Sequence, residues 1–211
     1  MKVRVKVCGI TSVRDALLAA ECGAGAIGMV FAESPRRIAS DTAIEITAAL
    51  PPFVMAVGVF VDETIENVRA TVERVGLHAV QLSGRESPGY VEKLRPIDVI
   101  KCVHVASRED LERAAAYRRA HILLDTASPR AAGGTGEVFD WTHAAGLAAE
   151  RRIILAGGLR AENVAEAIAT VKPWAVDVSS GVEAAPGVKD ADKVRRFIEN
   201  ARRARHAQAQ G

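Results

Sequence analysis

The sequence predicts an α/β fold, a single (β/α)8 TIM barrel with eight parallel strands inside and helices outside. Short runs rich in β-branched residues recur along the 211 residues, and each is followed by a helical pattern. The alternation continues for eight units without a linker or a shift in composition. Such regular alternation implies parallel strands joined by crossover helices, and eight units suit a closed barrel. A doubly wound open sheet is the alternative, but it would not need eight even repeats.

The first four units have recognisable strand and helix signals. Their strands are expected at residues 2–8, 25–31, 53–60 and 78–82, and their helices at 12–23, 40–50, 63–76 and 87–94. Ser12 and Asp15 have the spacing of a capping box. Ser40 or Asp41 is expected to open the second helix, and Gly76 to end the third.

The last four units continue the pattern. Their strands are expected at residues 99–105, 121–126, 152–158 and 174–181, and their helices at 107–119, 139–150, 161–171 and 190–204. Ser107 and Asp110 mark the start of the fifth helix. We therefore expect one barrel domain over residues 1–205, followed by a short C-terminal tail, 206–211.

The composition excludes several classes of function. Lys and Arg number 28 against 26 Asp and Glu, a net charge of +2, which favours neither nucleic acid nor a membrane surface as partner. No apolar run approaches the ~20 residues of a membrane span, and the start MKVRVKV does not resemble a signal peptide. The three cysteines are odd in number and far apart, which argues against disulfides and structural zinc and for a cytoplasmic location. The five histidines lack metal-site spacing, so no catalytic metal is expected.

The active site of such a barrel lies at the carboxyl ends of its strands. Cys8 closes the first strand and Asp125 the sixth, so the two should face each other across the mouth. An acid and a base in this arrangement suit proton-shuttling isomerisation, although a cysteine can also be simple packing and a strand-ending aspartate a loop cap. Gln81 and Asp177, in the fourth and eighth strands, are expected to contribute to the substrate site.

Glycine-rich and serine-rich loops follow the sixth, seventh and eighth strands. The last two places form the recurrent phosphate site of this fold, where backbone N–H groups donate to the anion. The alternative is that the glycines are turn residues only. The expected phosphate ligands are Gly134, Gly136, Gly157, Gly158, Ser179, Ser180 and Gly181.

An arginine pair lies in the loop after the second strand, within ESPRRIAS. Arg36 could clamp a substrate carboxylate through two parallel hydrogen bonds. The alternative is that Arg36 and Arg37 are solvated charges.

The motifs and their order resemble the phosphoribosylanthranilate isomerase family over nearly the whole chain. They are KVCGIT, GAIGMVF, SPR, PPFVMAVGVF, AVQLSG, LLDT, GGTG-x-x-FDW, LAGGL-x-x-ENV, AVDVSSGVE and PGVKD. The resemblance implies a (β/α)8 barrel and a step of L-tryptophan biosynthesis without a cofactor. That step is the Amadori rearrangement of N-(5'-phosphoribosyl)anthranilate to 1-(2-carboxyphenylamino)-1-deoxyribulose 5-phosphate.

The resemblance also implies roles for individual residues. Asp125 would be the general acid that protonates the ribose ring oxygen, and Cys8 the general base that removes the C2 proton. Arg36 would pair with the anthranilate carboxylate. The sequence departs from the family at Ser83, where a histidine is common. The contacts at that edge of the mouth are therefore open.

Two other classes of enzyme suit the sequence less well. Indole-glycerol-phosphate synthase would need a strand-ending lysine, but Lys2, Lys6 and Lys101 lie within strands, and a pentose-phosphate epimerase would need a metal set. A non-catalytic phosphometabolite-binding barrel is the alternative from another class. The expected partner is a small-molecule substrate, and the chain is expected to be a monomer, with a homodimer possible. Of the three thiols, only Cys8 is expected at the open mouth, and Cys102 should be screened within its strand.

Overall fold

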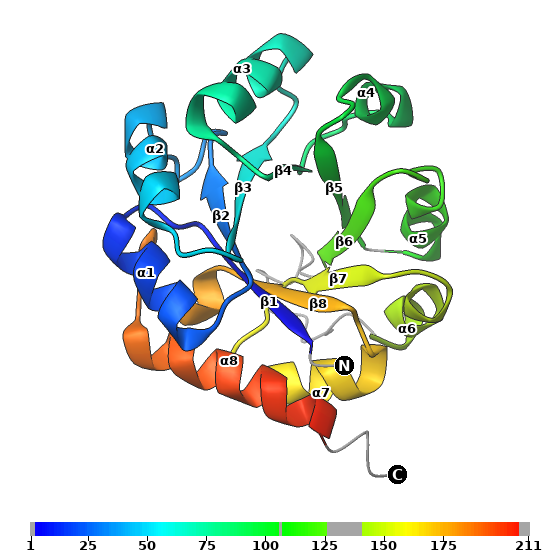
Figure 1. Ribbon diagram of the computed structural model, residues 1–211. Helices are drawn as coiled ribbons and strands as arrows, with labels where there is room; N and C mark the ends of the chain where they lie inside the picture. The colour runs from blue at the N-terminus through cyan, green and yellow to red at the C-terminus, as the bar shows by residue number, and fades with distance from the viewer. Residues whose placement is uncertain (1–2, 106, 126–140, 207–211) are drawn as a thin grey trace.

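The computed structural model describes residues 3–105, 107–125 and 141–206, which form a closed barrel of eight parallel strands (Figure 1). The strands are β1 (Arg4–Cys8), β2 (Ala26–Val30), β3 (Met55–Phe60), β4 (Ala79–Leu82), β5 (Asp98–His104), β6 (His121–Asp125), β7 (Ile153–Ala156) and β8 (Ala175–Val178). They pair in chain order, and β8 pairs with β1 to close the ring. The predicted fold class is confirmed.

Helices surround the strands on the outside of the ring (Figure 1). They are α1 (Val13–Cys22), α2 (Ser40–Ala49), α3 (Ile65–Val75), α4 (Pro88–Lys93), α5 (Arg108–Ala114), α6 (Trp141–Glu150), α7 (Val164–Val171) and α8 (Ala191–His206). Among the described residues, no helix is long and apolar enough to cross a membrane. The part of the tail beyond residue 206 lies outside the described residues.

Most helix ends follow the predicted chemistry. The Asp15 N–H donates to Ser12 Oγ at the start of α1, and Gly76 ends α3 with a left-handed φ of 73°. Ser107 is the N-cap of α5, as predicted, and it forms a capping box with Asp110. α2 begins at Ser40, as predicted, but its N-cap is Ala39, which makes no side-chain hydrogen bond.

The fifth helix is shorter than the sequence predicts. It ends at Ala114, because the next N–H groups, at residues 115–117, bond to carbonyls three residues back. Such i→i+3 bonds tighten the chain into turns and end the α-helix.

Strand alternation divides the apolar residues between two cores. Val5 and Val7 of β1 belong to the larger core of barrel and helix residues. The smaller core comes from six strands, β3 to β8, and contains Val57, Ala79, Ile100, Cys102, Leu123, Ile154, Ala156 and Ala175. In β1, Lys6 and Cys8 alternate with Val5 and Val7. The side chains of Lys6 and Cys8 therefore lie on the opposite face of the strand from the two valines.

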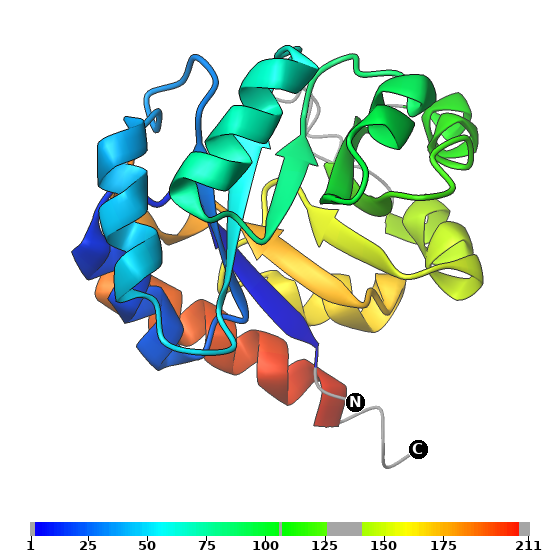
Figure 2. The same cartoon turned by 45° about the horizontal axis from the view of Figure 1, so that its top comes forward.

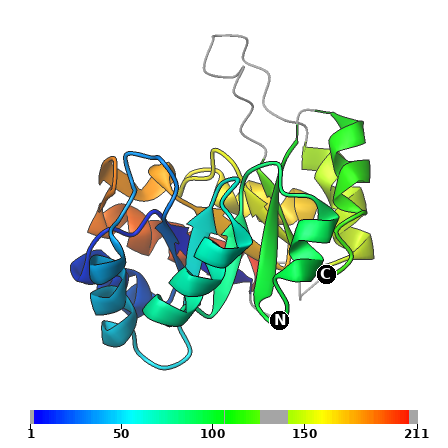
Figure 3. The same cartoon turned by 90° about the horizontal axis from the view of Figure 1, so that it is seen from above.

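A small hairpin between β8 and α8 was not predicted. A 3-10 turn, η2 (Ser180–Val182), leads into β9 (Glu183–Ala185), which pairs antiparallel with β10 (Val188–Lys189). Figure 2 shows β8 beside β1, and Figure 3 shows the loops after β2 and β7 on one side of the barrel. The hairpin carries Glu183 and Lys189 to the side of the barrel on which these loops lie.

Candidate active site

A cavity of about 310 Å³ opens at the carboxyl ends of the strands. It brings together Cys8 and Asp125, as predicted, with β7 and β8 between their strands. Gln81 and Asp177 also line it. The remaining lining residues are Ser83, Cys102, His104, Leu123, Ala156, Gly157, Gly158, Leu159, Val178, Ser179, Ser180 and Gly181.

Cys8 lies at the cavity wall with 8% of its surface exposed. Gly28 is its partner on β2, and a Cβ there would lie 2.6 Å from the Cys8 sulfur, so glycine leaves room for the thiol. Burial raises the pKa of Cys8, and the Lys6 ammonium opposes that rise. The thiol is therefore less open to water than the sequence predicted, and its anion depends on a neighbouring charge.

Lys6 is the group that supplies this charge. Its Nζ donates to Asp177 Oδ1 at 2.9 Å, and both side chains are more than nine-tenths buried. Burial alone would lower the pKa of Lys6, but Asp177 and Cys8 raise it above its ordinary value. Burial raises the pKa of Asp177, and Lys6 opposes that shift. An ammonium held in this way is a fixed positive charge next to the thiol.

Asp125 lies on the other side of the cavity and is more open, with 29% of its side chain exposed. His104 is its partner across the β5–β6 ladder, and His104 Nδ1 lies 3.4 Å from Asp125 Oδ2. A hydrogen bond to Asp125 raises the pKa of His104, and a bond to the Ser83 backbone acts in the same direction. Sequence reasoning assigned His104 no role, although its place at the end of β5 was visible.

Arg36 is held by a carboxylate of the protein itself. Its Nε and Nη2 donate to the two carboxylate oxygens of Glu183, at 2.8 and 2.7 Å. Lys189 Nζ donates to Glu183 as well, at 2.8 Å. Although burial opposes the shift, the bonds from Arg36 and Lys189 lower the pKa of Glu183 to about 2. Glu183 thus fixes the guanidinium and uses two of its five donors.

The phosphate loops predicted after β7 and β8 meet at the cavity. Gly157 and Gly158 have φ values of 90° and 62°, which favour glycine. A Cβ on Gly181 would overlap the Leu159 carbonyl oxygen, so only glycine allows the two loops to approach so closely. Gly157, Gly158, Ser179, Ser180 and Gly181 all line the cavity, whereas Gly134 and Gly136 lie outside the described residues.

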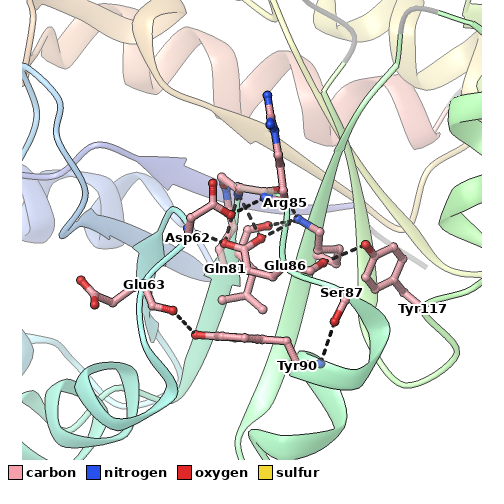
Figure 4. A network of polar contacts seen from close by, with 12 residues as sticks. Asp62, Glu63, Gln81, Arg85, Glu86, Ser87, Tyr90 and Tyr117 are labelled. Atoms are coloured by element: carbon pink, nitrogen blue, oxygen red, sulfur yellow. Dashed lines mark hydrogen bonds and ion pairs between the residues drawn. The ribbon is translucent and has the colours of Figure 1, made fainter.

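A buried ion pair of Glu86 with Lys101 fixes the loop after β4, and Figure 4 shows Glu86 within this network of polar contacts. Lys101 Nζ donates to Glu86 Oε2 at 2.8 Å, and also to the Leu82 and Gly84 carbonyls. Glu86 accepts from the Asp62 N–H at 2.9 Å, which ties this loop to the one after β3. Because both side chains of the ion pair are nearly fully buried, they hold the loop in one position.

Gln81 lines the cavity and has one unpaired acceptor among the described residues. Its Nε2 donates to Ser83 Oγ at 3.1 Å, whereas its buried Oε1 has no hydrogen-bond partner among the described residues. A buried unpaired acceptor is costly, so a bound ligand with a donor would satisfy it. This supports the expectation that Gln81 belongs to a substrate site.

One set of side chains among the described residues has the composition of a metal site. Cys102, His104 and Asp125 offer ligand atoms that lie within 4.8 Å of one another. The sequence offered no such spacing, because the three come from two neighbouring strands. Cys102 is buried as predicted, but it also lines the cavity, which was not predicted.

Known proteins resemble this chain over almost its full length. Residues 5–200 match the family model described as N-(5'phosphoribosyl)anthranilate (PRA) isomerase. The N-(5'-phosphoribosyl)anthranilate isomerase of Geobacter sp. (strain M21) is 51% identical over 201 residues, covering 95% of this chain and 98% of that protein.

Solved structures agree with the sequence match. The crystal structure of phosphoribosyl anthranilate isomerase from Thermotoga maritima superposes with a TM-score of 0.89 at 49% identity, covering 94% of this chain and 98% of that one. A phosphoribosyl anthranilate isomerase in complex with reduced 1-(o-carboxyphenylamino)-1-deoxyribulose 5-phosphate gives 0.86 at 47% identity, with the same coverage. A further Thermotoga maritima structure, of monomers of the dimeric enzyme, gives 0.85 at 44% identity and again the same coverage.

Proposed function

This chain belongs to the N-(5'-phosphoribosyl)anthranilate isomerase family, and we propose that Asp125 and Cys8 carry out its reaction as general acid and general base. The chain is an isomerase of tryptophan biosynthesis. The observation that carries the proposal is that both residues line one cavity, together with the glycine and serine loops after β7 and β8.

The reaction moves two protons, and the two sides of the cavity suit one each. Asp125 gives its proton to the ribose ring oxygen, and the ring opens to a Schiff base. Cys8 then removes the C2 proton, and the resulting enolamine tautomerises to the ketone. Proton transfer by a positioned group typically contributes ~10²–10⁴-fold. No cofactor is needed, because both steps are proton transfers within one substrate.

Lys6 belongs to this proposal as a positioning residue for Cys8. A thiol with a free pKa of ~8.5 is mostly protonated at neutral pH, and burial raises the pKa of Cys8 further. The fixed Lys6 ammonium favours the thiolate, and it cannot swing away because Asp177 holds it at 2.9 Å. The base therefore depends on a charge inside the barrel.

Two anionic groups of the substrate have candidate sites. The phosphate binds to N–H groups of Gly157, Gly158 and the segment 179–181, between two loops whose glycines let the backbone approach. Three guanidinium N–H groups of Arg36 remain for the anthranilate carboxylate after Glu183 has taken two. A crystal with inorganic phosphate bound elsewhere would contradict the first assignment.

The direct test is turnover of phosphoribosylanthranilate by the purified chain, followed by the loss of its fluorescence. The proposal expects turnover without added metal or cofactor. Binding of the product analogue without turnover would indicate a non-catalytic phosphometabolite-binding barrel instead. No binding and no turnover would point to another phosphate-binding barrel enzyme.

The oligomeric state and location complete the proposal. The sequence favoured a monomer, but Phe53 is fully exposed next to an apolar cavity of about 300 Å³, and one similar enzyme is described as dimeric. These observations favour a homodimer, which light scattering of the purified chain would detect. The three free cysteines suit the cytoplasm.

A further inference from the structure

We propose that Cys102, His104 and Asp125 form a zinc-binding site in the mouth of the barrel, through which Zn²⁺ reversibly inhibits the isomerase. The inhibition rests on the proposed role of Asp125 as general acid, because a carboxylate bound to zinc cannot protonate the substrate. The binding itself does not depend on that role.

The composition of the group points to zinc. Thiolate, imidazole and carboxylate are the three ligand types that zinc accepts together, and three protein ligands with an open fourth position are typical of accessible zinc sites. The softer thiolate disfavours magnesium and calcium, which prefer oxygen. All three side chains line the cavity, so a water or an ion can enter and fill the fourth position.

The geometry of the pair on β5 and β6 fits the same ion. His104 Nδ1 lies 3.4 Å from Asp125 Oδ2, which is long for a charged hydrogen bond. Two ligands at ~2.0–2.1 Å from a tetrahedral zinc lie ~3.3–3.4 Å apart, so this pair needs almost no movement. The full set lies within 4.8 Å, and a shift of about 1 Å would complete it.

Neighbouring groups fix the positions of His104 and Cys102. A ligating histidine usually gives its second ring N–H to a carbonyl or carboxylate, and His104 is also bonded to the Ser83 backbone. Ser83 makes a side-chain hydrogen bond to Cys102 as well. Lys101 and Glu86 in turn fix the loop that carries Ser83.

Binding must displace one proton. Without a metal, the buried Cys102 side chain carries the proton that is usual for a thiol at neutral pH. Zinc replaces the thiol proton, which passes to solvent through the open cavity, and the sulfur becomes a thiolate ligand. No oxidant or reductant is involved, and a chelator reverses the step.

The first experiment measures binding without using activity. Co²⁺ is titrated into the full chain and read by its thiolate-to-metal absorption, and Zn²⁺ is then added to displace it. We expect one site per chain in the wild type and in C22S, the matched control, since Cys22 lies on α1. C102S should lose the absorption. H104N should weaken binding by more than the ~10–100-fold that loss of an outer-shell partner costs.

The second experiment measures isomerase rates in zinc buffers. The wild type and C22S should be inhibited and recover fully with EDTA. C102S and H104N should keep their own starting rates at the zinc concentration that inhibits the wild type. Absorption that persists in C102S but disappears in C8S would overturn the site, as would the absence of saturable binding. Binding as expected in a chain without isomerase activity would leave the site standing and refute the proposed function.

Discussion

On the β8–β1 side of the cavity, Lys6, Asp177 and Cys8 are buried together, whereas on the β5–β6 side Asp125 and His104 are partly open to solvent. The difference matches what each proton transfer needs. A buried thiolate needs a nearby positive charge to be populated at neutral pH. Burial strengthens the attraction between the two charges, because the surroundings screen it less than water does. A general acid must regain a proton after each turnover, which access to water allows.

The largest expected effect is on the open side. Asp125→Asn keeps the shape of the side chain but removes the acid, so kcat should fall ~10²–10⁴-fold. Circular dichroism should be unchanged, because the residue is only partly buried. Isomerase rates at saturating substrate measure the effect. A kcat within a few-fold of the wild type would show that the acid lies elsewhere.

On the buried side, Lys6→Met should affect stability as well as rate. It leaves Asp177 buried without its partner, and breaking such a pair costs ~3–5 kcal/mol. The pKa of Cys8 should rise, because the charge that most opposes burial is gone. Urea unfolding and the pH dependence of thiol alkylation measure the two effects separately.

The double variant Lys6→Met/Asp177→Asn separates these two roles. Removing both charges should restore much of the stability but not the rate. Recovery of the wild-type rate in the double variant would mean that Lys6 only balances Asp177 and does nothing for Cys8.

A smaller effect is expected at the edge of the buried side. Arg36→Met should raise KM more than it lowers kcat, because a carboxylate contact acts in the ground and transition states alike. Glu183→Gln serves as the control, since it loosens Arg36 without removing the cation. A fall in kcat larger than the rise in KM would place Arg36 at the reacting centre instead.

The sequence predicted residues whose position follows from local pattern. Cys8 and Asp125 could be placed because each ends an apolar strand, and Gly157 and Gly158 because they follow β7 directly. The partners that give these groups their chemistry could not be placed. Lys6 and Asp177 are 171 positions apart, and only the closure of β8 onto β1 brings them together.

The same limit applies to Glu183, which is 147 positions from Arg36 and lies on a hairpin that no periodicity indicated. The fold followed from alternation, but α5 ended early because its last residues form turns. His104 had a visible signal, since it ends β5 beside the strand of Asp125. Without a rule for cross-strand partners, the sequence did not indicate that His104 would meet Asp125.

Alkylation of Cys8 tests the claim that it is the base most directly. In the C22S/C102S variant, Cys8 is the only thiol of the chain, so each label on the protein reports one residue. Iodoacetamide should abolish activity in proportion to the label found by mass spectrometry, and a bound product analogue should slow both equally. A chain fully labelled on Cys8 that retains its isomerase rate would contradict the account.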